Sequence, residues 1–87
     1  MTLVSYVQPF DMYQKIYVLD DNTKDTVEEV PCKLADFDAA VITLINTYGA
    51  KYLNLHGPEK YCLKIKQDID DLQILKYNKQ KLTVQIN

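Results

Sequence analysis

The sequence predicts an α+β fold in two layers, in which a mixed β-sheet of five to six strands carries two amphipathic helices on one face. Three observations support this prediction. Several short segments alternate apolar and polar residues, which is the periodicity of a strand. Two longer segments, 36–48 and 58–71, repeat apolar residues every three to four positions, as a helix does. The 87 residues suffice for one domain, 1–87.

Two strands and a turn are predicted at the N-terminus. Residues 2–7 form a short, mainly apolar segment that Pro9 interrupts. Residues 12–19 alternate, which is typical of a strand with one buried face. Asp and Asn side chains at 20–25 then predict a turn, because they hydrogen-bond their own backbone. One face of the second strand takes Met12, Ile16 and Val18, and the other takes Tyr13, Lys15 and Tyr17.

A third strand, 26–34, precedes the first helix. It is expected to bury Val30, Cys32 and Leu34. Pro31 indicates an edge strand or a bulge, because it has no N–H to donate. The spacing of the two cysteines, Cys32 and Cys62, fits neither a redox motif nor a metal site. We expect both to be reduced, buried thiols.

The first helix is predicted over 36–48, because start, stripe and stop signals agree. Asp36 is a favourable N-cap, and Asp38 adds a negative charge to the first turn. Gly49 suits the left-handed residue that ends a helix. The apolar stripe consists of Phe37, Ala40, Val41, Leu44, Ile45 and Tyr48.

A strand, a second helix and a hairpin complete the predicted order β-β-β-α-β-α-β-β. Residues 52–56 form the strand, whose pairing, parallel or antiparallel, stays open. The second helix, 58–71, begins at Pro58. Residues 73–77 and 81–86 predict a hairpin around a turn at 78–80. The side chains expected inside are Leu53, Leu55, Tyr61, Cys62, Ile65, Ile69, Leu82, Val84 and Ile86.

The alternative arrangement is a minimal ribonuclease H-like domain, whose element order is three strands, helix, strand, helix and strand. Such a nuclease holds two divalent cations between carboxylates that project from its central strands. The predicted strand interiors here carry Val, Ile, Leu and Cys, whereas the acidic residues lie in a turn and near helix ends. We therefore expect no enzyme activity, no catalytic residue, no metal site and no cofactor.

Composition limits the partners that the chain can bind. Its 10 basic residues are all lysine, and 12 acidic residues bring the net charge to −2. The absence of Arg argues against a dedicated DNA-binding protein, because Arg supplies the bidentate contacts to phosphate and guanine. The sequence offers neither an apolar segment of membrane-spanning length nor a secretory signal at its start. We therefore expect a cytoplasmic protein that has no membrane partner.

The uncovered face of the predicted sheet is the candidate binding site. If the helices pack on one face, tyrosines and polar side chains occupy the other. Tyrosine favours strands, so this face can be plain sheet surface. Tyrosine is also enriched at protein interfaces, and aromatic sheet faces stack single-stranded bases. The candidate partner-binding residues are Tyr13, Lys15, Tyr17, Tyr52, Asn54 and His56.

The run INTYGAKYLNLHGPEKYCLKIKQDID resembles a type of small protein encoded by phages of low-GC bacteria. In that type an amphipathic helix leads to the segment KYLNLHGPEKY and a second helix, and a short polar hairpin closes the chain. The resemblance covers about half of the chain. It implies a phage-encoded protein made in the bacterial cytoplasm, and it carries over no functional residue.

These observations predict a non-enzymatic protein that acts by binding a host protein, a phage protein or a second copy of itself. Two alternatives stay open. One is a single-stranded nucleic-acid-binding module that uses the tyrosine-bearing face of the sheet. The other is a structural or accessory protein of the virion.

Overall fold

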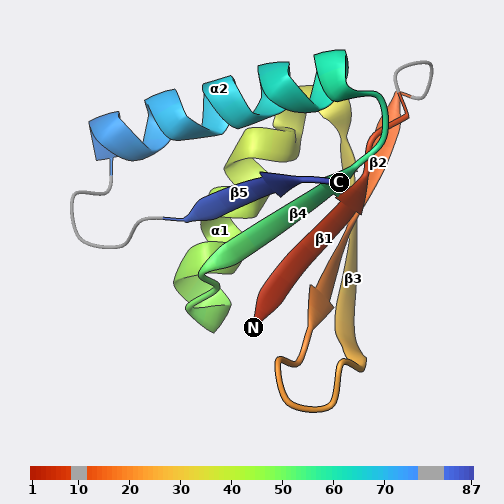
Figure 1. Ribbon diagram of the computed structural model, residues 1–87. Helices are drawn as coiled ribbons and strands as arrows, with labels where there is room; N and C mark the ends of the chain where they lie inside the picture. The colour runs from red at the N-terminus through yellow and green to blue at the C-terminus, as the bar shows by residue number, and fades with distance from the viewer. Residues whose placement is uncertain (9–11, 77–81) are drawn as a thin grey trace.

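The computed structural model describes residues 1–8, 12–76 and 82–87, with backbone alone for 72–76. Five strands form one mixed sheet in the order β3-β2-β1-β4-β5 (Figure 1). The predicted α+β class, with a mixed sheet and two helices, is confirmed. The elements are β1 (Thr2–Tyr6), β2 (Tyr13–Leu19), β3 (Thr26–Lys33), a 3₁₀ turn (Leu34–Asp36), α1 (Phe37–Tyr48), β4 (Tyr52–His56), α2 (Glu59–Lys76) and β5 (Thr83–Ile86).

The centre of the sheet is parallel. β1 pairs with β4 from Thr2 opposite Tyr52 to Tyr6 opposite His56, and β5 adds in parallel to the other side of β4. β2 is antiparallel to both β1 and β3. The pairing that the sequence left open for residues 52–56 is therefore parallel on both sides. β3 is an edge strand, as Pro31 indicated.

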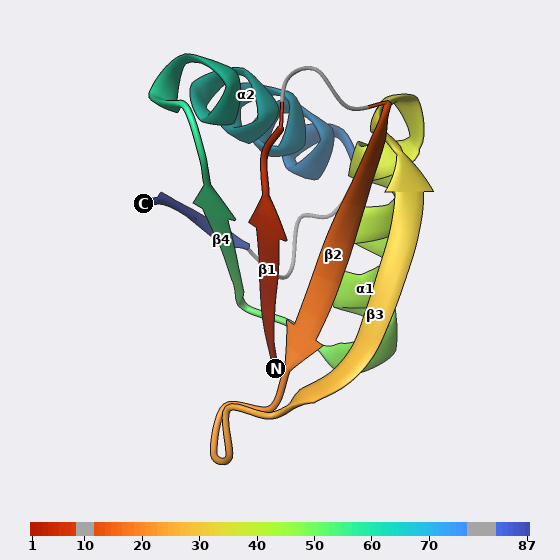
Figure 2. The ribbon, with the colours of Figure 1, turned by 90° about the vertical axis from the view of Figure 1, so that its right-hand side faces the viewer.

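Both helices lie on the same face of the sheet. Figure 2 shows the strands in front and the helices behind and above them. α1 connects β3 to β4, and α2 connects β4 to β5. The largest side chains of the core come from both helices and from one face of the strands. They are Leu3, Ile16, Val18, Phe37, Val41, Leu53, Leu55, Cys62 and Ile69.

α1 ends as the sequence predicts. Gly49 adopts the left-handed conformation, with φ +66°, and its N–H donates to the carbonyl oxygen of Ile45 at 2.8 Å. Asp36 stands at the N-cap position, but its side chain makes no capping hydrogen bond. The hydroxyl of Tyr48 donates to the carboxylate of Glu28, which fixes the end of α1 to β3. This hydrogen bond, followed by burial, raises the pKa of Tyr48.

α2 is longer than the sequence predicts. It continues to Lys76, so the strand expected over 73–77 is wrong for residues 73–76. The sequence left the end of this helix uncertain, because three aspartates at 68–71 disfavour a helix C-terminus there. The helix continues through residues that lack Gly and Pro and ends at a lysine. Residue 77, the turn at 78–80 and residue 81 lie outside the described residues, and the last predicted strand is present as β5.

Gln14, rather than Met12, faces the core from β2. Met12 precedes the strand and is exposed, so its predicted inward direction is wrong. The buried Gln14 donates from Nε2 to Ser5 Oγ at 2.9 Å, and Ser5 Oγ donates to the carbonyl oxygen of Lys15 at 2.8 Å. This polar pair is tolerated in the core because both side chains are hydrogen-bonded.

Several more side chains that the sequence places in the core are less buried. Val30, Ile65 and Ile86 are half-buried and pack against the core. Leu34 lies in the 3₁₀ turn and is exposed, because β3 ends one residue earlier. Tyr61 is exposed because the face of α2 that meets the sheet passes through Cys62 and Ile69. Cys32 is half-buried, whereas Cys62 is fully buried as predicted, and both are free thiols.

Two glycines provide a matched test of the fold. Gly49 and Gly57 have φ values of +66° and +138°, which favour glycine. A Cβ at Gly57 would lie 2.6 Å from the carbonyl oxygen of Val7, whereas a Cβ at Gly49 would meet nothing within 4 Å. We expect Gly49→Ala to lower the free energy of unfolding by about 1 kcal/mol. Gly57→Ala should lower it by more than about 2 kcal/mol, because it adds a backbone clash.

Urea denaturation followed by circular dichroism measures both variants. Equal losses of stability would show that the contact between Gly57 and Val7 is not close.

Candidate interaction surface

The uncovered face of the sheet collects the exposed strand tyrosines. Alternate residues of a strand point to opposite faces, so the neighbours of the core residues point away from the helices. We call this surface the open face. It contains Thr2, Val4 and Tyr6 of β1, Tyr13, Lys15 and Tyr17 of β2, Glu29 of β3, Tyr52, Asn54 and His56 of β4, and Thr83 and Gln85 of β5.

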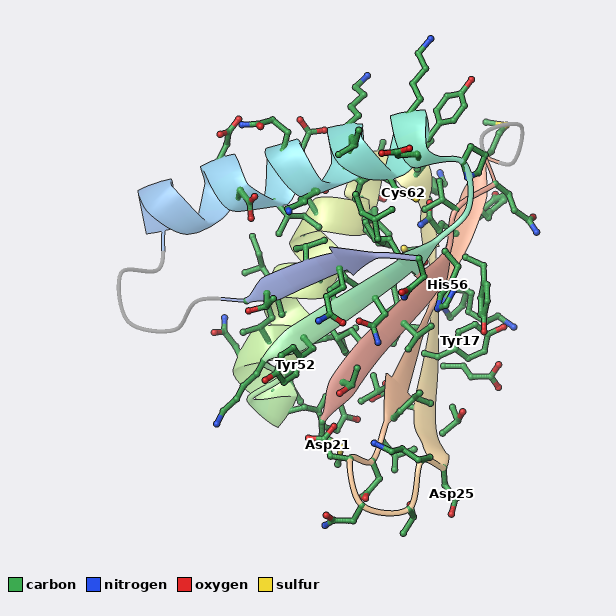
Figure 3. The ribbon with its side chains drawn as sticks, in the orientation of Figure 1. Tyr17, Asp21, Asp25, Tyr52, His56 and Cys62 are labelled. Atoms are coloured by element: carbon green, nitrogen blue, oxygen red, sulfur yellow. The ribbon has the colours of Figure 1, made fainter. Side chains whose placement is uncertain are left out.

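Three aromatic rings on the open face form one cluster, which we call the ring cluster. Tyr6 stacks on His56 with 4.9 Å between ring centroids and 25° between planes. Tyr17 stands edge-on to Tyr6, with centroids 6.0 Å apart and planes at 79°. Figure 3 shows Tyr17 and His56 close together on the side away from Cys62 of α2. Tyr6 remains 53% exposed, so the ring cluster presents a solvent-facing surface.

The other two tyrosines lie at opposite ends of the open face. Tyr52 pairs with Thr2 at the start of β4, far along the strand from His56 (Figure 3). Tyr13 begins β2, opposite Lys33 at the end of β3. All six residues predicted for the site therefore lie on the same face, but only Tyr17 and His56 belong to the ring cluster.

Lys15 brings a positive charge to the ring cluster. Its Nζ lies 5.9 Å from the centroid of the Tyr17 ring, within the range of a cation–π contact. The same Nζ lies 3.5 Å from a carboxylate oxygen of Glu29. Both partners of this ion pair are about half exposed, so it contributes little to stability. Because Glu29 offsets Lys15, this part of the open face gains little net positive charge.

Asn54 has a buried hydrogen-bond acceptor that lacks a partner. Its Oδ1 is buried and accepts no hydrogen bond from the described residues. Asn54 stands between Val4 of β1 and Gln85 of β5. Val4 is buried although it lies on the open face, which shows how closely the side chains of this row cover one another. An unpaired buried acceptor costs roughly 1–3 kcal/mol.

Tyr6 is the member of the ring cluster that sequence reasoning missed. The segment 2–7 is mainly apolar on both faces, so its alternation does not decide which residues point inward. The structure buries Ser5 and leaves Tyr6 outside. Only the parallel pairing of β1 with β4 puts Tyr6 beside His56, and local sequence does not specify that pairing.

The two strands at the centre of the sheet, β1 and β4, carry no carboxylate side chains. In residues 1–8, 12–76 and 82–87, no three His, Cys, Asp or Glu side chains come together as a metal site. Over the same residues, no helix combines the length and apolar character needed to cross a membrane.

Comparisons of the chain with protein-family models, with curated proteins and with solved structures find no match. The observed element order, β-β-β-α-β-α-β, is the one expected of the ribonuclease H-like alternative. An element order by itself carries no activity.

The unpaired acceptor of Asn54 gives a stability prediction. We expect Asn54→Val to raise the free energy of unfolding by about 1 kcal/mol, because it removes a buried acceptor and adds a residue that favours strands. Gln85→Val is the matched control, since Gln85 lies in the same row but is exposed. Chemical denaturation compares the two variants. A destabilised Asn54→Val protein would show that the Asn54 amide is satisfied in solution.

Proposed function

We propose that the protein is a non-enzymatic interaction protein that binds a protein partner through the open face. The observation that supports this proposal is the exposed ring cluster on the face opposite both helices. Tyrosine is enriched at interface hot spots and loses little conformational entropy on burial. Tyr6, Tyr17 and His56 already hold one another in place, so binding orders few additional side chains.

The composition of the open face favours a transient complex. Obligate homodimers use larger and more apolar interfaces. The open face combines the ring cluster with polar and charged side chains, among them Lys15, Glu29 and Gln85. The open face therefore suits a separate protein better than a permanent second copy.

The proposed setting is the cytoplasm of a bacterial host, where a phage-encoded protein acts on a host or phage protein. This part of the proposal is supported by the resemblance of the segment KYLNLHGPEKY and not by the fold. A component of the virion is the alternative partner in the same setting.

Two exposed apolar side chains allow a controlled binding experiment. Tyr6 belongs to the ring cluster, and Leu63, which is about equally exposed, lies on α2, away from the open face. We expect a partner to be retained by the wild-type protein and by Leu63→Ala, and to bind Tyr6→Ala about tenfold more weakly. Pull-downs from bacterial lysate with quantitative mass spectrometry, followed by titration of the purified partner, measure this difference. Circular dichroism controls for folding.

The proposal would be contradicted if the protein is strictly monomeric by light scattering and retains no partner at micromolar concentration. A partner that binds Tyr6→Ala and wild-type protein equally would also contradict the use of the open face.

Single-stranded nucleic-acid binding is a second candidate function, favoured by one arrangement. The Tyr6–His56 stack presents aromatic faces beside the Lys15 ammonium, and bases stack on such platforms. The charge is unfavourable, because the chain carries a net −2 and Glu29 is paired with Lys15.

An oligonucleotide titration distinguishes the two functions. We expect a labelled oligothymidine to bind with a Kd no tighter than about 100 µM at physiological salt, and Tyr17→Ala and Tyr52→Ala to leave this weak binding unchanged. Fluorescence anisotropy over a salt series measures it. Tight binding that weakens steeply with salt and is lost in Tyr17→Ala would replace the protein-partner proposal.

A further inference from the structure

A groove on the helix-covered side of the molecule is separate from the ring cluster. It has a volume of about 850 Å³ and lies where the ends of β1 and β3 and the start of β2 meet the 3₁₀ turn, α1 and α2. Phe37 and Ile65 contribute to its apolar wall. The more exposed apolar side chains that line it are Met12, Tyr13, Leu34 and Tyr61.

These four side chains are unusually exposed for large apolar residues. The exposed fractions are 78% for Met12, 65% for Tyr13, 44% for Leu34 and 42% for Tyr61. Single exposed apolar residues need no explanation, but a group of them around one hollow indicates an interaction site. Met12, Leu34 and Tyr61 are also residues that the apolar pattern of the sequence assigns to the core. The groove therefore exposes side chains that, by their apolar spacing in the sequence, would be expected to be buried.

Two carboxylates give the groove its charge preference. Asp38 from the first turn of α1 and Asp68 from α2 both line it. Asp38 is half-buried and Asp68 is exposed, and burial, followed by repulsion from Asp68, raises the pKa of Asp38. Lys33 and Lys64 also line the groove, but within the described residues no ion pair joins either lysine to these carboxylates. A cation that entered the groove would relieve this repulsion.

We propose that the groove binds a segment of a partner protein in which a lysine or arginine is flanked by apolar side chains. The basic group lies beside Asp38 and Asp68, and the apolar side chains pack on Leu34, Met12 and Tyr61. Small-molecule sites usually enclose most of the ligand surface, whereas four of the apolar side chains that line this groove are exposed to solvent. Tyr and Met are enriched at protein interfaces, and Met adapts to varied partners.

Selection from a displayed library of random twelve-residue peptides against the immobilised full chain tests the proposal. We expect enrichment of peptides that carry Lys or Arg between apolar residues. The consensus peptide, synthesised with a fluorescent label, then provides the probe for anisotropy titrations. Leu34→Ser and Asp68→Asn should each weaken its binding about tenfold.

Matched variants outside the groove are the controls. Leu63 of α2 is 50% exposed and does not line the groove, so Leu63→Ser should change peptide affinity less than about twofold. Glu59→Gln, which removes one acidic charge near the start of α2, should have an equally small effect. Tyr6→Ala should leave peptide binding intact, which separates the groove from the open face.

Four outcomes would overturn the proposal. They are a selection that enriches no peptide, a consensus that is acidic or uncharged, equal losses of affinity in Leu34→Ser and Leu63→Ser, and loss of peptide binding in Tyr6→Ala. Light scattering adds a fifth. If the wild-type protein is a dimer and Leu34→Ser is a monomer, the occupant of the groove is a second copy of this chain and the proposal is wrong.

Discussion

The handedness of two crossover connections determines where the other features of the molecule lie. β3, β4 and β5 run in the same direction. They also lie in this order across the sheet, with β2 and β1 between β3 and β4. Because connections between parallel strands are right-handed, α1 and α2 must cover the same face. That face becomes the core, and the opposite face stays open. Strand alternation then directs Tyr6, Tyr17 and His56 away from the helices.

Two helices do not cover a five-stranded sheet completely. Five strands are about 24 Å wide, whereas two helices, each about 10 Å across, cover about 20 Å. The cover is incomplete where β3 ends and the chain turns into α1, and Leu34 of the 3₁₀ turn there stays exposed. The groove with Leu34 and Met12 at its rim is the result. The open face and the groove therefore both exist because two helices cover only part of the sheet.

Local patterns were sufficient for some elements and insufficient for others, for physical reasons. The first helix and the strand 52–56 were predicted well, because their signals are local. The apolar spacing and Gly49 specify the helix, and the alternation of apolar and polar residues specifies the strand. The end of the second helix was missed, because residues 72–76 contain neither Gly nor Pro, so the sequence has no local stop signal there. Gln14 was missed because its partner, Ser5, lies on another strand. Tyr6 was missed for the same kind of reason, since its neighbour His56 is brought beside it only by the parallel pairing.

The two surfaces meet at one residue. Tyr13 begins β2 on the open face, and it also lines the groove. A partner that rests on the ring cluster and extends past Tyr13 reaches the groove, where a basic segment can lie beside Asp38 and Asp68. Asp38 and Asp68 then supply the charged contact that the nearly neutral ring cluster lacks, and the aromatic rings supply the apolar contact area. Tyr13 therefore connects the open face to the groove, so that one partner can contact both surfaces.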